Sequence, residues 1–386
     1  MGGAINLRVY LDSAATTKVD KQVVKVMMPY FSEKYGNASS IHDFGGEAEE
    51  ALKSSRKIIA DSINAKPEEI IFTSGGTEGN NFVLKGLAFR MKEKGKDHII
   101  TTKIEHPSIV QPCKWLEKQG FKVTYLNVDS EGFVNFEELK KAITPKTFLV
   151  SIIHGNNEIG TIQDIASIGK ICREKGIYFH IDACQSYLKT EIDVEKQKLD
   201  FVTLNAHKIH GPKGIGALFA RKGIELYPLL DGGGQESKMR GGTENIPGIV
   251  GFSESVKIWD KSYIKYMEKL RDYLIKEVLA IGKVKLNGPK EKRLCNNANF
   301  SFYGIDGEAL LLILNNKGIA VSTGSACSAK SLKGSPVLEA IGLDDLNSHG
   351  SLRLSLSRET TKKEIDYTIK ELKKAVDKLR SISMIQ

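Results

Sequence analysis

The sequence has no apolar run long enough to cross a membrane. Its longest uninterrupted apolar stretches, such as Ala309–Leu314, are far shorter than the ~18 to 20 residues that a spanning helix needs. The N-terminal residues also lack the basic segment followed by an apolar one that marks a secretory signal. We therefore expect a cytoplasmic protein that does not act at a membrane.

Cysteine is scarce, and its spacing excludes two classes of site. The five cysteines form no CxxC pair and no spacing typical of zinc ligands. This argues against a disulfide framework and a structural metal, and leaves room for one reactive thiol. The sequence also contains no internal repeat and no low-complexity tract.

Charge is spread along the chain rather than gathered into a basic block. The formal net charge of +9 comes from 56 basic and 47 acidic residues. Diffuse charge favours solubility more than recognition of nucleic acid, so we expect no direct nucleic-acid binding. A length of 386 residues predicts two domains, because single cores usually stop growing beyond ~250 residues.

Short apolar runs alternate with helical segments from residue 8 to about 220, which indicates βαβ units and a mostly parallel sheet. Most runs are apolar throughout, as in a sheet covered by helices on both faces. The predicted strands are Val9–Leu11, Ile70–Phe72, His98–Thr102, Lys122–Leu126, Thr147–Ile153, Ile177–Ile181, Phe201–Leu204 and Gly216–Ala220.

The C-terminal part of the sequence has a different, α+β pattern. A long helix is predicted over 244–281, and a last helix opens with the capping box of Thr361 and Glu364. We expect a large α/β domain over 13–258, and a small domain formed by 1–12 and 259–386. Further strands are predicted at Val284–Leu286, Ala298–Phe302, Ile319–Ser322 and Ser351–Ser357, with a helix at Glu308–Asn315.

Lys208 lies just after a predicted strand, in the segment NAHKIHGPKGIGALF. An amine at this place is suited to form an imine with an aldehyde cofactor. The alternative is an ordinary solvated loop lysine. Asp182 ends another predicted strand, where it can pair with the protonated nitrogen of a pyridoxal ring or serve as a helix cap or salt-bridge partner.

Three further strand ends carry polar groups. Gly76 and Thr77 lead into a predicted helix, whose free N–H groups suit a phosphate, although a plain N-cap turn is the alternative. His106 and Asn156 follow two other strands. Since ligands bind at the carboxyl ends of such strands, these groups together indicate a pyridoxal-phosphate site.

In these blocks the sequence resembles the class V branch of fold-type I pyridoxal-phosphate enzymes, specifically cysteine desulfurases of the NifS/IscS type. The resemblance covers nearly the whole chain, in YLDSAATT, GNASSIH, FTSGGTEGNN, NNEIGTIQ, HIDACQS, RGGTEN, STGSACSA and SLRLSLSRET. It implies an α/β fold with a mostly parallel, seven-stranded type of sheet covered by helices, plus a smaller α+β domain.

The resemblance also implies residue roles. Lys208 bonds to pyridoxal 5′-phosphate, Asp182 pairs with its ring nitrogen, and His106 stacks on the ring and moves protons. Arg353, with Asn156, receives the substrate carboxylate, and Thr243 reaches the phosphate across a homodimer interface. The other implied cofactor contacts are Gly76, Thr77, Asn156, Gln185, Asn205, Ala206 and His207. Asn205 stands where the family usually has Ser.

The cysteine of STGSACSA, Cys327, matches the family residue that takes sulfur from the substrate. The implied reaction converts L-cysteine to L-alanine and leaves a persulfide on Cys327. The sulfur is then transferred to an iron–sulfur scaffold protein, or to an acceptor for tRNA thiolation or cofactor synthesis. No resident metal is implied, although transient ligation of a cluster by Cys327 stays open. The alternatives are a selenocysteine lyase or aminotransferase of the same fold, and a catalytically silent scaffold subunit.

Overall fold

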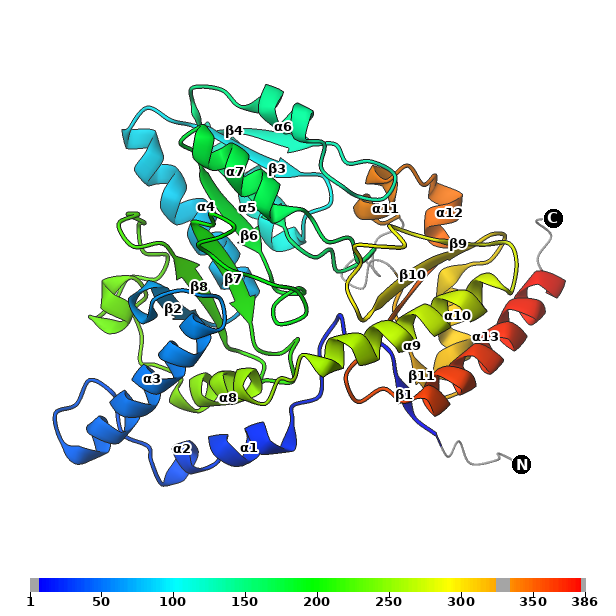
Figure 1. Ribbon diagram of the computed structural model, residues 1–386, viewed down its shortest axis with the longest axis horizontal. Helices are drawn as coiled ribbons and strands as arrows, with labels where there is room; N and C mark the ends of the chain where they lie inside the picture. Colours follow the sequence, from blue (N-terminus) through cyan, green and yellow to red (C-terminus); the bar gives the residue numbers. More distant parts are fainter. Residues whose placement is uncertain (1–6, 324–333, 383–386) are drawn as a thin grey trace.

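A computed structural model describes residues 7–323 and 334–382 (Figure 1). Its centre is a seven-stranded sheet, which confirms the predicted mostly parallel α/β class. Only β8 runs against its neighbours, pairing antiparallel with both β2 and β7. The strand order is β2 (Ile70–Thr73), β8 (Gly216–Ala220), β7 (Phe201–Asn205), β6 (Tyr178–Asp182), β5 (Thr147–Ile153), β3 (His98–Thr102) and β4 (Lys122–Leu126).

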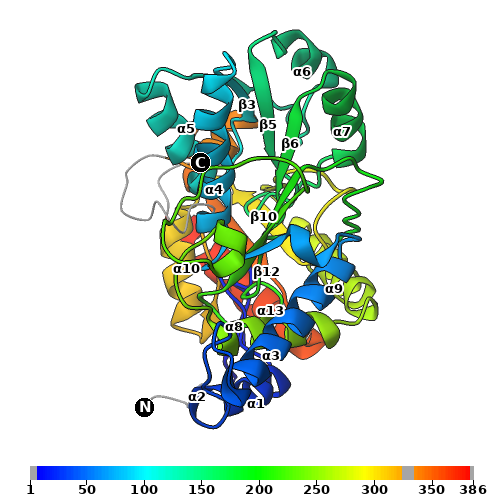
Figure 2. The same ribbon diagram turned by 90° about the vertical axis from the view of Figure 1, so that its left-hand side faces the viewer.

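Helices cover both faces of this sheet, because its strands are apolar on both sides. Adjacent strand residues divide between two cores: Ile99 packs on one face and Ile100 on the other. Figure 2 shows the two helical layers on opposite sides of the strands. One layer contains α4 (Gly76–Glu93) and α5 (Pro107–Lys118), and the other α3 (Asp43–Asp61), α6 (Phe136–Ala142), α7 (Ile165–Glu174) and α8 (Ile246–Lys257).

A second hydrophobic core lies in the C-terminal part of the chain (Figure 1). Its antiparallel sheet has the order β12 (Ser351–Ser355), β10 (Asn297–Phe302) and β9 (Val284–Leu286), beside the parallel pair β1 (Val9–Tyr10) and β11 (Ile319–Ala320). The helices α9 (Ser262–Leu279), α10 (Gly307–Asn315) and α13 (Lys362–Ile382) pack on it. The predicted capping box is present, since Thr361 and Glu364 exchange hydrogen bonds of 2.7 and 3.3 Å.

Shorter elements complete the described chain. They are the helices α1 (Lys21–Met27), α2 (Pro29–Ser32), α11 (Pro336–Ala340) and α12 (Asp345–His349), and the 3₁₀ turns Pro67–Glu69 and Gln235–Lys238. Among the residues that the structure describes, no helix combines the length and the apolar character required to cross a membrane.

Two sequence-based expectations need correction. The single helix expected over 244–281 is wrong, because α8 ends at Lys257 and α9 begins at Ser262, where the Asp260 carboxylate accepts from the Ser262 N–H at 2.7 Å. The first predicted strand is not part of the βαβ sheet, since β1 pairs with β11. The division into domains at 12/13 and 258/259 stays a prediction, supported by the separate cores.

Candidate functional site

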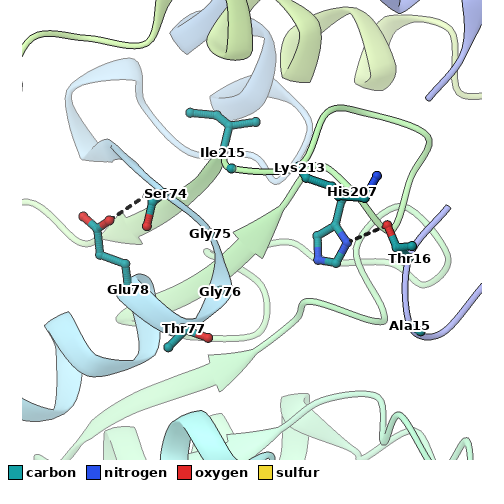
Figure 3. Close-up of a pocket in the computed structure, with 11 residues that line it drawn as sticks. Ala15, Thr16, Ser74, Gly75, Gly76, Thr77, Glu78, His207, Lys213 and Ile215 are labelled. Carbon is teal, nitrogen blue, oxygen red and sulfur yellow. Dashed lines mark hydrogen bonds between the residues drawn. The ribbon is translucent and has the colours of Figure 1, made fainter. Parts of the chain in front are cut away.

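A backbone cradle lies where β2 passes into α4 (Figure 3). The N–H groups of Gly76, Thr77 and Glu78 meet no acceptor in the described part of the chain, because they begin the helix. They line a cavity of about 340 Å³ together with Ala15, Thr16, Ser74, Gly75, His207, Lys213, Gly214 and Ile215. Free amides at the positive end of a helix dipole suit a phosphate group.

Two glycines shape this cradle for different reasons. Gly75 has a φ of 149°, a conformation that side-chain-bearing residues rarely adopt. The backbone of Gly76 has no positive φ, but a Cβ at this position would lie 2.4 Å from the Cys184 Sγ. The thiol of Cys184 therefore requires glycine at position 76, and the backbone stays open to a ligand.

Lys208 follows β7 and is half-buried. It donates to the carbonyl oxygens of Ala14 and of Ala15, the latter at 2.7 Å. Burial, with help from the nearby charges of Arg353 and Lys189, lowers the pKa of Lys208 to about 8. A substantial neutral fraction of this amine is present near neutral pH, as a nucleophile toward an aldehyde requires.

Asp182 ends β6 and is 4% exposed. Its carboxylate accepts from the Cys184 N–H at 2.9 Å and from the Asn80 side-chain amide at 2.7 Å. Two neutral donors stabilise the anion and leave it lone pairs for a further donor. The group fits the ring nitrogen of a protonated pyridine.

His106 caps the N-terminus of α5 with its side chain. The Nδ1 atom accepts from the Ser108 N–H at 3.1 Å and lies 2.7 Å from the Ser108 Oγ. Burial lowers the pKa of His106, and this effect is larger than the opposing effect of the Asp182 charge. The ring is therefore neutral at pH 7.

Asn156 and Gln185 are both buried but make different contacts. The side chain of Asn156 links two loops, because it donates to the Ile104 carbonyl at 2.9 Å and accepts from the N–H groups of Glu158 and Ile159. Gln185 donates to the Ala14 carbonyl at 2.8 Å, the same oxygen that Lys208 contacts. Their predicted contacts with cofactor and substrate stay predictions.

The residues around Lys208 lie beside the cradle. His207 lines the cavity, and its Nδ1 lies 3.1 Å from the Thr16 Oγ1 (Figure 3). Burial and the charge of Lys208 lower the pKa of His207 to about 4, so its ring is neutral. Asn205 and Ala206 are buried, and the Asn205 Oδ1 has no hydrogen-bond partner within the described residues.

Arg353, on β12, is 3% exposed and already paired. Its Nη2 donates to the Asp12 carboxylate at 2.9 Å and its Nη1 to the Asn157 carbonyl at 3.0 Å. Its Nε makes no hydrogen bond to any residue of the described ranges. The guanidinium lies near enough to Lys208 to lower the pKa of that amine, as a substrate-carboxylate ligand should.

The two remaining predicted residues are less directly located. Thr243 lines a second cavity of about 260 Å³, which shares Ser74, Gly214 and Ile215 with the cradle. Its contact with a partner's phosphate stays a prediction. Cys327 falls within 324–333, outside the described residues.

The fit of these residues to pyridoxal phosphate can be judged from their own chemistry. Free amides suit the phosphate, a clamped carboxylate suits the ring nitrogen, and a buried amine suits the aldehyde. The three groups follow β2, β6 and β7, which run in one direction, so they meet at one edge of the sheet. The donor set fits the cofactor.

Sequence reasoning missed three residues at this site, namely the buried Asn80 and Ser108 and the half-buried Asp12. Asn80 and Ser108 link Asp182 to His106 by hydrogen bonds, and Asp12 pairs with Arg353. The motifs FTSGGTEGNN and YLDSAATT contain Asn80 and Asp12, and Ser108 lies two residues after His106, yet no local signal indicates what these residues contact.

Comparison with known proteins gives a consistent result. The model of the family described as aminotransferase class-V matches residues 9–368. The cysteine desulfurase IscS of Dictyoglomus turgidum is 50% identical over 380 residues, which cover 97% of this chain and 96% of that protein. Two solved structures are also similar. A NifS-like protein has a TM-score of 0.91, 40% identity and coverage of 96% of this chain and 100% of its own. SspA in complex with cysteine has a TM-score of 0.83, 38% identity and coverage of 92% and 100%.

Proposed function

The chain belongs to the aminotransferase class-V family and, within it, to the cysteine desulfurases that use pyridoxal phosphate. We propose which of its residues carry out each part of the removal of sulfur from L-cysteine. One observation carries the assignment of roles: the phosphate cradle, Asp182, His106 and Lys208 all follow strands that end at the same edge of the sheet. When bound there, pyridoxal phosphate supplies an aldehyde for amines and an electron-accepting ring.

Lys208 holds the cofactor and later carries a proton. Its pKa of about 8 makes the neutral amine accessible near neutral pH. Asp182 would keep the ring nitrogen protonated, because hydrogen bonds from the Cys184 N–H and the Asn80 amide hold its carboxylate in place.

Arg353 orients the substrate by its carboxylate, for which a guanidinium fork is suited. The sulfur acceptor is Cys327, whose thiolate attacks the substrate sulfur. The carbon–sulfur bond breaks and a sulfur–sulfur bond forms, so that the products are L-alanine and a persulfide on Cys327. The other cysteines are poor candidates, because burial raises the pKa of Cys172 to about 12 and of Cys295 to about 11, and raises that of Cys113 and Cys184 as well.

Partners follow from the same chemistry. A persulfide needs an acceptor, and we propose an iron–sulfur scaffold protein or another sulfur acceptor in the cytoplasm. We also propose a homodimer in which Thr243 completes the partner's phosphate site. The exposed position of Thr243 on a cavity contiguous with the cradle supports a shared site.

The test is an assay of purified protein with L-cysteine and with L-selenocysteine. We expect a yellow protein that forms one alanine per sulfur released and prefers cysteine. Preference for selenocysteine, or transamination without sulfur release, would favour one of the alternative activities.

Mass measurement in solution tests the homodimer. The variant Thr243→Ala should lower the affinity for the cofactor while the two subunits stay associated. A fully active monomer would contradict the shared site.

A further inference from the structure

Four buried or half-buried side chains form a continuous hydrogen-bond chain behind the proposed ring site. The Asn80 Nδ2 donates to the Asp182 Oδ2 at 2.7 Å and to the Ser108 Oγ at 2.8 Å. The Ser108 Oγ in turn lies 2.7 Å from the His106 Nδ1. Asn80 is fully buried and Ser108 is 7% exposed, so water does not compete for these contacts.

The orientation of the Asn80 amide is determined by its neighbours. The reverse orientation would set the amide oxygen against the Asp182 carboxylate, two acceptors at contact distance. Both amide hydrogens are therefore committed, one to Asp182 and one to Ser108. The Asn80 Oδ1 is left buried with no partner among the described residues. An unsatisfied buried oxygen lowers the stability of the folded protein. The two hydrogen bonds that the Asn80 Nδ2 donates therefore hold the side chain in this orientation.

The same chain decides which ring nitrogen of His106 carries the proton. The Ser108 Oγ accepts from Asn80, so its own hydrogen is free to donate to the His106 Nδ1. The Ser108 backbone N–H also donates to this atom, at 3.1 Å. A nitrogen that receives two donors has no proton, so the neutral ring has its hydrogen on Nε2.

We propose that Asn80 and Ser108 are positioning residues that fix the Asp182 carboxylate and the Nε2–H tautomer of His106 together. This rests on the proposed roles of Asp182 and His106 in the desulfurase reaction. Within the described residues Nε2 makes no hydrogen bond, so its N–H can donate a hydrogen bond to the reacting molecule.

This tautomer gives His106 and Lys208 different tasks. An Nε2–H group cannot accept a proton at that atom, so His106 donates a hydrogen bond to the reacting molecule and Lys208 acts as the base. The lowered pKa values of both groups agree with a neutral ring and an accessible neutral amine.

Nitrogen-15 NMR of histidine-labelled holoprotein tests the tautomer directly, with His106→Gln used to assign the signal. We expect an unprotonated Nδ1 and a protonated Nε2 in the wild type. Ser108→Ala removes the hydroxyl donor, so the Nδ1 signal should shift, and Ser108→Thr should restore it. A protonated Nδ1 in the wild type, or an Nδ1 signal unchanged in Ser108→Ala, overturns the proposal.

Kinetics supply the second measurement. Ser108→Ala should lower kcat about 3- to 10-fold, as expected for one neutral hydrogen bond, with little change in KM. Asn80→Ala should cost more, roughly 10- to 100-fold, because it leaves the Asp182 carboxylate short of a donor. Asn81→Ala is the matched control, because within the described residues this neighbouring side chain donates only to the Thr77 carbonyl.

Equal losses in Asn80→Ala and Asn81→Ala would overturn the proposal, as would failure of Ser108→Thr to recover kcat. The NMR result does not depend on turnover. A wild-type protein without desulfurase activity therefore refutes the proposed function, whereas a protonated Nδ1 refutes the positioning roles of Asn80 and Ser108.

Discussion

Arg353 and Asp12, which are 341 positions apart in the chain, form a partly buried ion pair of 2.9 Å. The Arg353 side chain is 3% exposed and that of Asp12 is 20% exposed. The guanidinium therefore already has a carboxylate partner before any substrate carboxylate arrives. Asp12 both stabilises a buried cation and competes with the substrate for it.

Asp12→Asn should separate these two effects. Without the competing carboxylate, the KM for L-cysteine should fall, by about 3- to 10-fold, since the buried guanidinium is then short of an anion. The ligand-free protein should lose about 1 to 3 kcal/mol of stability for the same reason. Steady-state kinetics and thermal unfolding measure the two. A raised KM would show that Asp12 orients Arg353 rather than competing with substrate.

Lys208 should take up the cofactor with an unusual pH dependence. In protein stripped of cofactor, the rate of covalent attachment should rise with pH and level off above about 8, because only the neutral amine attacks an aldehyde. An exposed lysine would give a midpoint near ~10.4. Borohydride trapping and peptide mapping at several pH values measure the rate. An adduct on any lysine other than Lys208 would contradict the assignment.

Gly76→Ala should weaken cofactor binding by about tenfold or more, because its Cβ would lie 2.4 Å from the Cys184 Sγ. In the double variant Gly76→Ala/Cys184→Ala the sulfur is gone, and the nearest remaining atom of residue 184 is its Cβ at 3.8 Å. Affinity should recover, as measured by fluorescence titration of the apoprotein. Cys184→Ala alone is the control. No recovery in the double variant would mean that the cradle tolerates no side chain at all.

Cys327→Ser should abolish turnover while substrate still binds. Lys208, Asp182 and Arg353 need no thiol, so cysteine should still change the visible spectrum, whereas sulfur release should fall by orders of magnitude. Mass spectrometry after one turnover without reductant should find one extra sulfur, about 32 Da, on the wild-type peptide with Cys327. Cys295→Ser is the matched control, because Cys295 is buried. Sulfur on Cys184 or Cys295 would refute the role of Cys327.

Local patterns were sufficient to predict most of the fold. The runs at His98–Thr102, Lys122–Leu126, Thr147–Ile153 and Gly216–Ala220 are strands with the predicted bounds. They are apolar or β-branched runs bounded by turns, and these are properties of neighbouring residues. The break between α8 and α9 was missed, because the hydrogen bond from the Ser262 N–H to Asp260 that lies at the break leaves no mark on hydrophobic periodicity.

The sequence by itself determined the kinds of group at the site, because an amine at Lys208, a carboxylate at Asp182 and glycines before a helix are chemical facts of the chain. Only the tertiary structure decided which groups meet. The Asn80–Asp182 contact spans 102 residues and the Arg353–Asp12 contact 341. Such contacts exist only because the parallel strands end at one edge of the sheet and β1 pairs with β11, where burial excludes water and makes each hydrogen bond specific.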